Sequence, residues 1–176
     1  MLYNGGHLWG EVGWSGSTTL ICASLDRPRG DTGSMFLGEF VHTLDSKGRL
    51  TVPARYRAEL EAGMVVTRGI DRCLAVFPMA KWKAISGRVS ELPMMNRKAR
   101  ALERFLFASA ADVSPDKQGR ILIPPRLRKY ADLDGEVVVA GLNDHIELWN
   151  PSAWKAECDR ADGHEFDLDS WAALGI

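Results

Sequence analysis

The chain has 176 residues, enough for one domain or two small ones. Apolar residues make up 45% and charged residues 26%, which is ordinary for a soluble globular protein and excludes a wholly disordered, collagen-like or coiled-coil chain. No apolar run approaches the ~20 residues of a membrane-spanning helix, so we expect no membrane partner. The three cysteines are far apart, which argues against a disulfide framework or a zinc cluster and fits a reducing compartment.

Charge is unevenly distributed along the chain. Residues 157–176 carry six acidic residues and one basic residue, for a net charge of −5, and residues 1–34 have a net charge of −1. The stretch between them, 35–156, is therefore at +5. A basic body with an acidic tail favours a polyanionic partner, although chance and a solvated tail explain the same numbers equally well.

The first 34 residues show no persistent periodicity and are rich in Gly, Ser and Thr. Met35 then begins a clearly patterned region. Two explanations stay open: translation begins naturally at Met35, so that residues 1–34 are a mis-assigned upstream extension, or these residues form a disordered arm.

An extended run over 36–44 leads into an Asp-x-x-Gly turn at 45–48. Asp45 can accept a hydrogen bond from the backbone two residues on, and Gly48 supplies positive φ. A short strand at 49–52 follows and ends at Pro53, which begins a short helix to residue 60. Further strands are predicted at 64–67 and 74–77, and further helices at 79–89 and, capped by Asn96, up to residue 107.

An internal repeat is the most informative feature of the sequence. Residues 45–53 recur as 116–124, shifted by 71, and after a one-residue insertion Gly69 aligns with Gly141 and Trp82 with Trp154. The second copy thus predicts strands near 110–115, 120–123, 136–140 and 145–149, with helices at 125–130 and 151–158. Because a half of about 50–60 residues buries only a marginal core, we predict that the first two strands of each copy pair with the other copy.

The chain carries no catalytic motif that survives inspection: GxSxG, P-loop and GxGxxG patterns are absent. His42 and His145 lack a partner at metal-ligand spacing. We therefore expect no enzyme activity, no cofactor and no metal. Trp82 and Trp154 are expected to anchor helices to the sheet.

Basic residues gather around the repeated turn and the short helix after it. If a pseudo-dyad relates the copies, the two clusters can share one surface. Arginine suits both phosphate oxygens and guanine edges, so duplex DNA is the predicted partner. In the alternative, Arg49 and Arg120 pair with Asp45 and Asp116 and only hold the turns. The candidate DNA contacts are Lys47, Arg49, Arg55 and Arg57 in the first copy and Arg120, Arg126 and Arg128 in the second.

The MFLG run at 35–38, DSKGRLTVPARYR at 45–57, DKQGRILIPP at 116–125 and IELW at 146–149 resemble the MraZ family of bacterial transcriptional regulators, which contain two SpoVT-AbrB-like units. The resemblance implies a mixed α/β, mostly β fold: a duplicated swapped-hairpin AbrB-like β-barrel with short helices and a pseudo-two-fold axis within one chain. The implied parts are units at 39–82 and 110–154, connecting helices at 83–109 and an acidic tail at 155–176.

The resemblance also implies function. It predicts a cytoplasmic, nucleoid-associated protein that forms ring-like homo-oligomers and takes no small-molecule ligand. It predicts binding to tandem repeats in double-stranded promoter DNA and mainly repression of its own division and cell-wall gene cluster. The family's DNA-contacting turn maps onto Lys47, Arg49, Arg55 and Arg57. The second copy departs from the pattern at Gln118 and Pro125, which puts its share of the base contacts in doubt.

One rival function uses the same fold. An antitoxin-like module would hold another protein rather than DNA, and the acidic tail could serve that purpose. An enzyme is the weaker rival, because no acid, base or nucleophile pair is visible.

Overall fold

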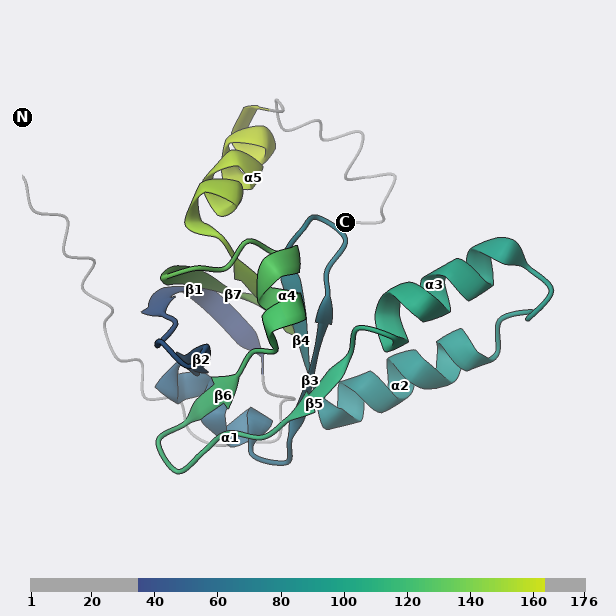
Figure 1. Ribbon diagram of the computed structural model, residues 1–176, viewed down its shortest axis with the longest axis horizontal. Coiled ribbons are helices and arrows are strands. Elements are labelled where there is room, and N and C mark those ends of the chain that lie inside the picture. Colours follow the sequence, from purple (N-terminus) through teal and green to yellow (C-terminus); the bar gives the residue numbers. More distant parts are fainter. Residues whose placement is uncertain (1–34, 164–176) are drawn as a thin grey trace, which may run out of the picture. The chain divides into compact units, whose positions relative to one another are not determined.

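The computed structural model describes residues 35–163, which form a mixed α/β fold of strands and helices (Figure 1). The expectations for residues 1–34 and for the acidic tail from residue 164 lie outside this range. The first copy contributes β1 (Phe36–Thr43), β2 (Arg49–Thr51), η1 (Ala54–Tyr56), α1 (Arg57–Leu60), β3 (Met64–Arg68), β4 (Leu74–Pro78) and α2 (Met79–Ser90). After α3 (Arg97–Phe107), the second copy contributes β5 (Ala111–Val113), β6 (Arg120–Leu122), α4 (Pro125–Tyr130), β7 (Glu136–Asn143), β8 (Ile146–Trp149) and α5 (Pro151–Gly163).

The strands form an open six-stranded sheet and a separate two-stranded ribbon. The large sheet is antiparallel, in the order β1-β7-β8-β4-β3-β5, and β2 pairs with β6, while Leu50 of β2 also forms an isolated antiparallel bridge with Leu44. The closed barrel expected from the family resemblance is therefore not formed by strand pairing within residues 35–163. The short β2 and β6 leave the large sheet and pair with each other, so β1 and β5 remain its edges.

Pairing between the copies is extensive. β1 runs antiparallel to β7 from Phe36 opposite Asn143 to Thr43 opposite Glu136. β2 pairs with β6, and β5 pairs with β3. The prediction that the first two strands of each copy pair with the other copy is thus confirmed, and neither copy completes its sheet alone.

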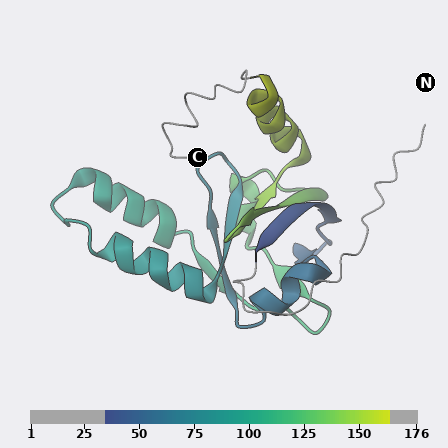
Figure 2. The same ribbon diagram turned by 180° about the vertical axis from the view of Figure 1, so that it is seen from behind.

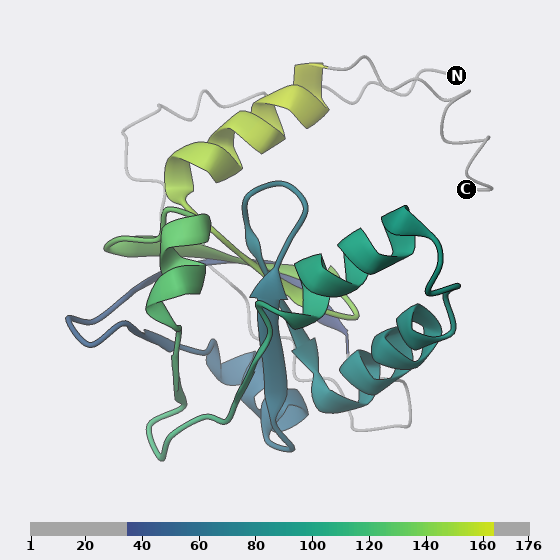
Figure 3. The same ribbon diagram turned by 45° about the vertical axis from the view of Figure 1, so that its right-hand side comes forward.

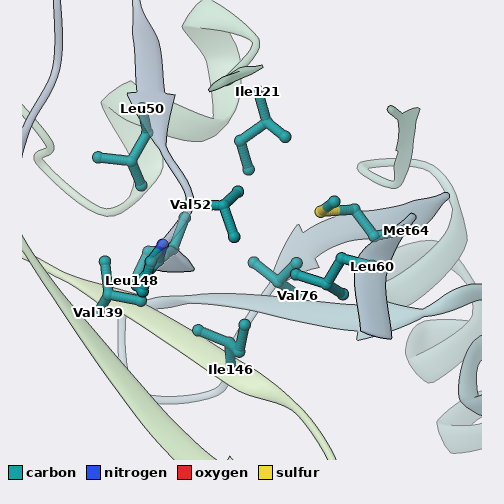
Figure 4. Close-up of a pocket in the computed structure, with 10 residues that line it drawn as sticks. Leu50, Val52, Leu60, Met64, Val76, Ile121, Val139, Ile146 and Leu148 are labelled. Carbon is teal, nitrogen blue, oxygen red and sulfur yellow. The ribbon is translucent and has the colours of Figure 1, made fainter. Parts of the chain in front are cut away.

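Both copies fill one apolar core, whose side chains point toward one another from strands and helices on all sides (Figure 4). The packing leaves a cavity of only about 10 Å³ between them, lined by apolar side chains and at the threshold of the space that one water molecule needs. Because each copy covers the apolar face of the other, the two copies together bury a larger core than either could bury alone. The central side chains are Leu50, Val52, Leu60, Met64 and Val76 from the first copy and Ile121, Val139, Ile146 and Leu148 from the second.

The helices α2 and α3 lie side by side beyond one end of the sheet, as Figures 1 and 2 both show. Trp82 of α2 contacts Phe77, with ring centroids 6.1 Å apart, and Phe107 of α3, at 5.7 Å. Trp154 of α5 lies 5.5 Å from Trp149 of β8. Both tryptophans therefore anchor helices, as predicted from the repeat.

The start of α3 is also as predicted. The side chain of Asn96 accepts hydrogen bonds from the N–H groups of Lys98 (2.8 Å) and Ala99 (3.4 Å), which makes it a helix cap. Across residues 35–163, no helix has both the length and the apolar character to cross a membrane.

Candidate nucleic-acid interface

The first repeated turn is built by one carboxylate. Asp45 Oδ1 accepts hydrogen bonds from the backbone N–H groups of Lys47 and Arg49, each at 2.9 Å. The Gly48 N–H closes the turn onto the Asp45 carbonyl at 2.8 Å, and Gly48 has φ of 77°. An L side chain is strained in this left-handed region, so the turn requires glycine here.

The second turn repeats the first almost atom for atom. Asp116 Oδ1 accepts from the N–H groups of Gln118 at 2.9 Å and Arg120 at 3.0 Å. Gly119 donates to the Asp116 carbonyl at 2.8 Å and has φ of 74°. The turns predicted from the Asp-x-x-Gly spacing are confirmed in both copies.

An arginine is tied to each of these carboxylates. Arg49 binds Asp45 Oδ2 through Nε at 2.7 Å and Nη2 at 2.6 Å, and Arg120 binds Asp116 Oδ2 at 2.9 and 2.7 Å. Hydrogen bonds from the Arg49 backbone and guanidinium lower the pKa of Asp45 to about 2, and those from the Arg120 guanidinium and backbone do the same for Asp116. The two arginine side chains remain 30% and 26% exposed. Since a guanidinium carries five N–H groups, each has donors left for another partner.

The two turns lie at the two ends of one ribbon, and each is bonded to the other copy. The Val52 N–H donates to the Gly119 carbonyl at 2.8 Å, and the Ile123 N–H donates to the Gly48 carbonyl at 3.0 Å. These two bonds flank the β2–β6 ribbon, so one turn adjoins each of its ends. One short ribbon therefore carries both turns, and the lysine of each turn, Lys47 and Lys117, is exposed.

Arg57 packs on the turn of the other copy. Its Nε donates to the Val52 carbonyl at 3.0 Å. A Cβ built on Gly119 would lie 2.5 Å from this Nε and 2.7 Å from Cζ, too close for any real contact. The guanidinium of Arg57 therefore fills the space that a side chain at position 119 would need.

Arg128 does the same in the opposite direction. Its Nε donates to the Ile123 carbonyl at 3.2 Å, and a Cβ on Gly48 would lie 2.7 Å from its Cζ. Each copy thus sends one arginine across to cover the turn of the other. This crossed pair explains, beyond the backbone conformation, why both turns need glycine.

The other two predicted residues, Arg55 and Arg126, lie at the margins of the turns. Arg55 is exposed, with its Cζ 5.9 Å from the ring of Phe40 in β1. Arg126 donates to the carbonyls of Ala108 (2.9 Å) and Ala110 (3.3 Å), beside the connection from α3 to β5. The structure therefore gathers five of the predicted cations at the paired turns and places these two at their margins. The five are Lys47, Arg49, Arg57, Arg120 and Arg128.

Lys117 is missing from the predicted set but belongs at this surface. It is exposed in the second turn, and together with Arg57 it lines a hollow beside Asp116. Its position inside the repeated motif is the sequence signal by which it can be recognised as part of this surface. The first turn has Lys47 and the second Lys117, one position earlier in the motif, so each turn carries one lysine.

Within the described part of the chain, no three His, Cys, Asp or Glu side chains are arranged to hold a metal. Cys73 is fully buried, and burial raises the pKa of its thiol to about 12, which suits a packing role rather than a nucleophile.

Comparison with known proteins identifies relatives over most of the chain. A model of the family described as "MraZ protein, putative antitoxin-like" matches residues 35–105 and again 106–170. The protein named Transcriptional regulator MraZ from Roseiflexus castenholzii is 53% identical over 121 residues, which cover 69% of this chain and 85% of that protein. The protein of the same name from Carboxydothermus hydrogenoformans is 48% identical over 127 residues, covering 72% and 89%.

A more distant relative agrees with these two. Transcriptional regulator MraZ from Pediococcus pentosaceus is 42% identical over 134 residues, covering 76% of this chain and 94% of that protein. The two matched segments of the family model divide the chain near the boundary between the two copies found in the sequence. The chain therefore belongs to the MraZ family.

Proposed function

We propose that this protein is a transcriptional regulator that binds duplex promoter DNA through its paired turns. The observation that carries the proposal is the reciprocal pair of backbone hydrogen bonds by which the Gly48 and Gly119 carbonyls join the β2–β6 ribbon, so that this one ribbon carries an arginine-bearing turn at each end. The regulatory role follows the names of the curated relatives, which designate regulators and not enzymes.

In this proposal the cations have different tasks. Lys47, Arg49 and Arg120 contact phosphates or guanine edges with the donors that the turns leave exposed. Arg57 and Arg128 are less free to contact the DNA backbone, because each covers the turn of the other copy. Their task is to hold these turns in place. Arg55 and Arg126 flank this centre. A two-stranded ribbon such as β2–β6 is of the size that the major groove admits.

The finer features of the proposal concern assembly and target. We infer units at 39–82 and 110–154 related by swapped hairpins, connecting helices at 83–109 and an acidic tail at 155–176. Subunits would form a homo-oligomeric ring that binds tandem boxes upstream of the protein's own division and cell-wall genes, mainly to repress them. A ring makes the second and later contacts intramolecular, which raises avidity by roughly 10²–10⁴ where the box spacing fits.

The test is promoter binding by Arg49→Ala. We expect binding to be lost, because one arginine contact contributes about 1–3 kcal/mol and the loss repeats in every subunit of a ring. Arg120→Ala should weaken binding less, since the second copy departs from the family pattern. The matched control is Arg88→Ala on the exposed face of α2, which removes the same charge away from the turns.

The measurement is a titration of duplex DNA in graded salt, with the oligomeric state of each variant checked by light scattering. Affinity should fall steeply as salt increases, because bound phosphates release counterions. Wild-type affinity in Arg49→Ala, or an equal loss in Arg88→Ala, would contradict the role of the turns.

An antitoxin-like, protein-binding function is the second candidate, favoured by the wording of the matched family description and by the acidic residues from 157 onward. It predicts that the purified protein ignores promoter DNA but forms a stoichiometric complex with the product of a neighbouring gene. Co-expression followed by size-exclusion chromatography separates the two functions.

A further inference from the structure

A cleft lined by cations lies apart from the paired turns. It is formed by α4, by the segment that connects β3 and β4, and by the residues between α3 and β5, and it has a volume of about 470 Å³. In Figure 3 the loop between β3 and β4 stands between α4 and α3. The polar side chains that line it are Arg68, Arg72, Ser109, Arg126, Lys129 and Tyr130, and no acidic residue is among the lining residues.

The arginines of this cleft bind only neutral groups. Arg68 donates from Nε to Ser109 Oγ at 3.0 Å and from Nη2 to the Phe105 carbonyl at 3.1 Å. Arg126 donates to two backbone carbonyls at the edge of the cleft. Neither these two arginines nor Arg72 and Lys129 form a salt bridge anywhere in residues 35–163. Four like charges therefore share one cleft without a counter-charge from the described chain, which is the electrostatic condition for an anion site.

Aromatic contacts hold two of the guanidinium groups in place. The Cζ of Arg68 lies 4.7 Å from the ring of Phe105 and 5.5 Å from that of Tyr130, and the Cζ of Arg72 lies 5.6 Å from the Tyr130 ring. The Tyr130 hydroxyl donates to the Gly69 carbonyl at 2.8 Å, which fixes the ring itself. A site arranged before binding loses less side-chain entropy when the ligand arrives. Because the Tyr130 ring already faces two guanidinium groups, the cleft is suited to an anionic group rather than to a stacked base.

The repeat shows that this cleft occurs once in the chain. At the shift of 72 residues, Arg68 corresponds to Ala140 and Arg72 to Asp144, so the second copy lacks both arginines. Asp144 instead forms a salt bridge with Lys81. The cleft is therefore not a second version of the pseudo-symmetric turns, and its charge needs its own explanation.

We propose that this cleft binds a phosphate group, carried either by a phosphorylated small molecule or by the backbone of a nucleic acid. A phosphate presents several charged oxygens to guanidinium groups in fixed directions, which suits a cleft with three arginines better than a single carboxylate would. The volume lies within the range of small-molecule sites and exceeds what one phosphate needs.

Calorimetric titration of the full-length protein with inorganic pyrophosphate tests the proposal. We expect saturable binding with one site per chain. The double variant Arg72→Gln/Lys129→Gln should bind at least about tenfold more weakly, since it removes two charged donors. Both side chains are exposed and neither makes a structural hydrogen bond, so the variant should fold. The control is Lys83→Gln/Arg88→Gln, which removes the same charge from the exposed face of α2.

Three results would overturn the phosphate site. They are no binding of pyrophosphate to the wild-type protein, unchanged binding in the cleft variant, and an equal loss of binding in the α2 control. Circular dichroism spectra of the variants confirm that any loss is not a loss of folding.

Titration of duplex DNA with the same variants identifies the source of the phosphate. If the DNA backbone supplies it, the cleft variant binds DNA more weakly and its salt dependence falls by about 0.9 for each lost phosphate contact. If a small molecule supplies it, DNA affinity stays unchanged while pyrophosphate affinity falls. The pyrophosphate measurement does not depend on the turns, so failure of the proposed DNA-binding function would leave this result intact.

Discussion

The two turns at 45–48 and 116–119 are nearly identical in structure, whereas the residues around them are not. Each turn has one aspartate that accepts two backbone N–H groups and holds an arginine, and each is covered by an arginine from the other copy. Outside the turns, Arg55 lies over an aromatic ring of β1, while its counterpart Arg126 donates to carbonyls beside β5. The comparison teaches that local hydrogen bonds preserve a repeated motif, while packing against different neighbours gives its flanks different roles.

The largest expected effect is a difference in stability between substitutions at Gly69 and Gly141, which occupy equivalent positions in the two copies. A Cβ on Gly141 would lie 2.4 Å from Tyr56 Oη and 2.7 Å from the Phe36 carbonyl carbon, and that backbone cannot yield without disturbing β1. A Cβ on Gly69 would meet mainly Cys73 Sγ, a side-chain atom, at 2.3 Å. We expect Gly141→Ala to lower the free energy of unfolding by about 3 kcal/mol and Gly69→Ala by about 1 kcal/mol, measured by urea denaturation. The reverse order would show that β1 can shift and Cys73 cannot.

The next prediction concerns the crossed arginines. Gly119→Ala should cost about 1–2 kcal/mol from its left-handed backbone alone, and more because the new Cβ displaces Arg57. Gly48→Ala should behave alike through Arg128. A double-mutant cycle of Gly119→Ala with Arg57→Ala should give a coupling energy of about 0.5–3 kcal/mol, since the second change removes the clash. Strictly additive free energies of unfolding would mean that the two residues do not touch in solution.

The smallest expected effect is the pH dependence of the turns, because the two ion pairs are solvent-exposed. Asp45 and Asp116 have folded-state pKa values near 2, below the usual 3.8. A carboxyl group whose pKa is lowered on folding stabilises the protein above pH 3.8, and this contribution is lost as the pH falls toward 2. The stability of the wild type, measured as its unfolding midpoint, should therefore decrease as the pH is lowered from about 4 to about 2, the range between the two pKa values. Asp45→Asn and Asp116→Asn should each make this decrease with pH smaller. A slope unchanged in both variants would assign the acid sensitivity to other groups.

Much of the secondary structure could be predicted because its causes are local. The Asp-x-x-Gly spacing predicts both turns, Pro53 and Pro124 mark the ends of β2 and β6, and Asn96 caps α3. The repeat also predicts that the copies pair with each other, since neither half can bury a core alone. The extension of β7 to Asn143 exceeds the predicted strand, because β1 supplies partners along its whole length.

The candidate site was predictable only in part. The sequence places Arg49 and Arg120 beside carboxylates, so both their ion pairs and their nearness to the turn follow from four-residue spacing. The crossed positions of Arg57 and Arg128 do not follow, because each depends on a turn about 60 or 80 residues away that only the folded ribbon brings close. Strand pairing within the described residues does not close the barrel that the resemblance implies, because β2 and β6 pair apart from the large sheet.

The sequence by itself determined the duplication, the two glycine turns, the order of strands and helices and the family, because each depends on neighbouring residues or on matching one stretch of chain with another. Only the tertiary structure decided which cations meet. It set the Arg57 and Arg128 guanidinium groups on the opposite turns, and it brought Arg68, Arg72, Arg126 and Lys129 into one cleft without a carboxylate. Contacts of that kind join residues far apart in the chain, and their geometry is set by how the strands of the two copies pair.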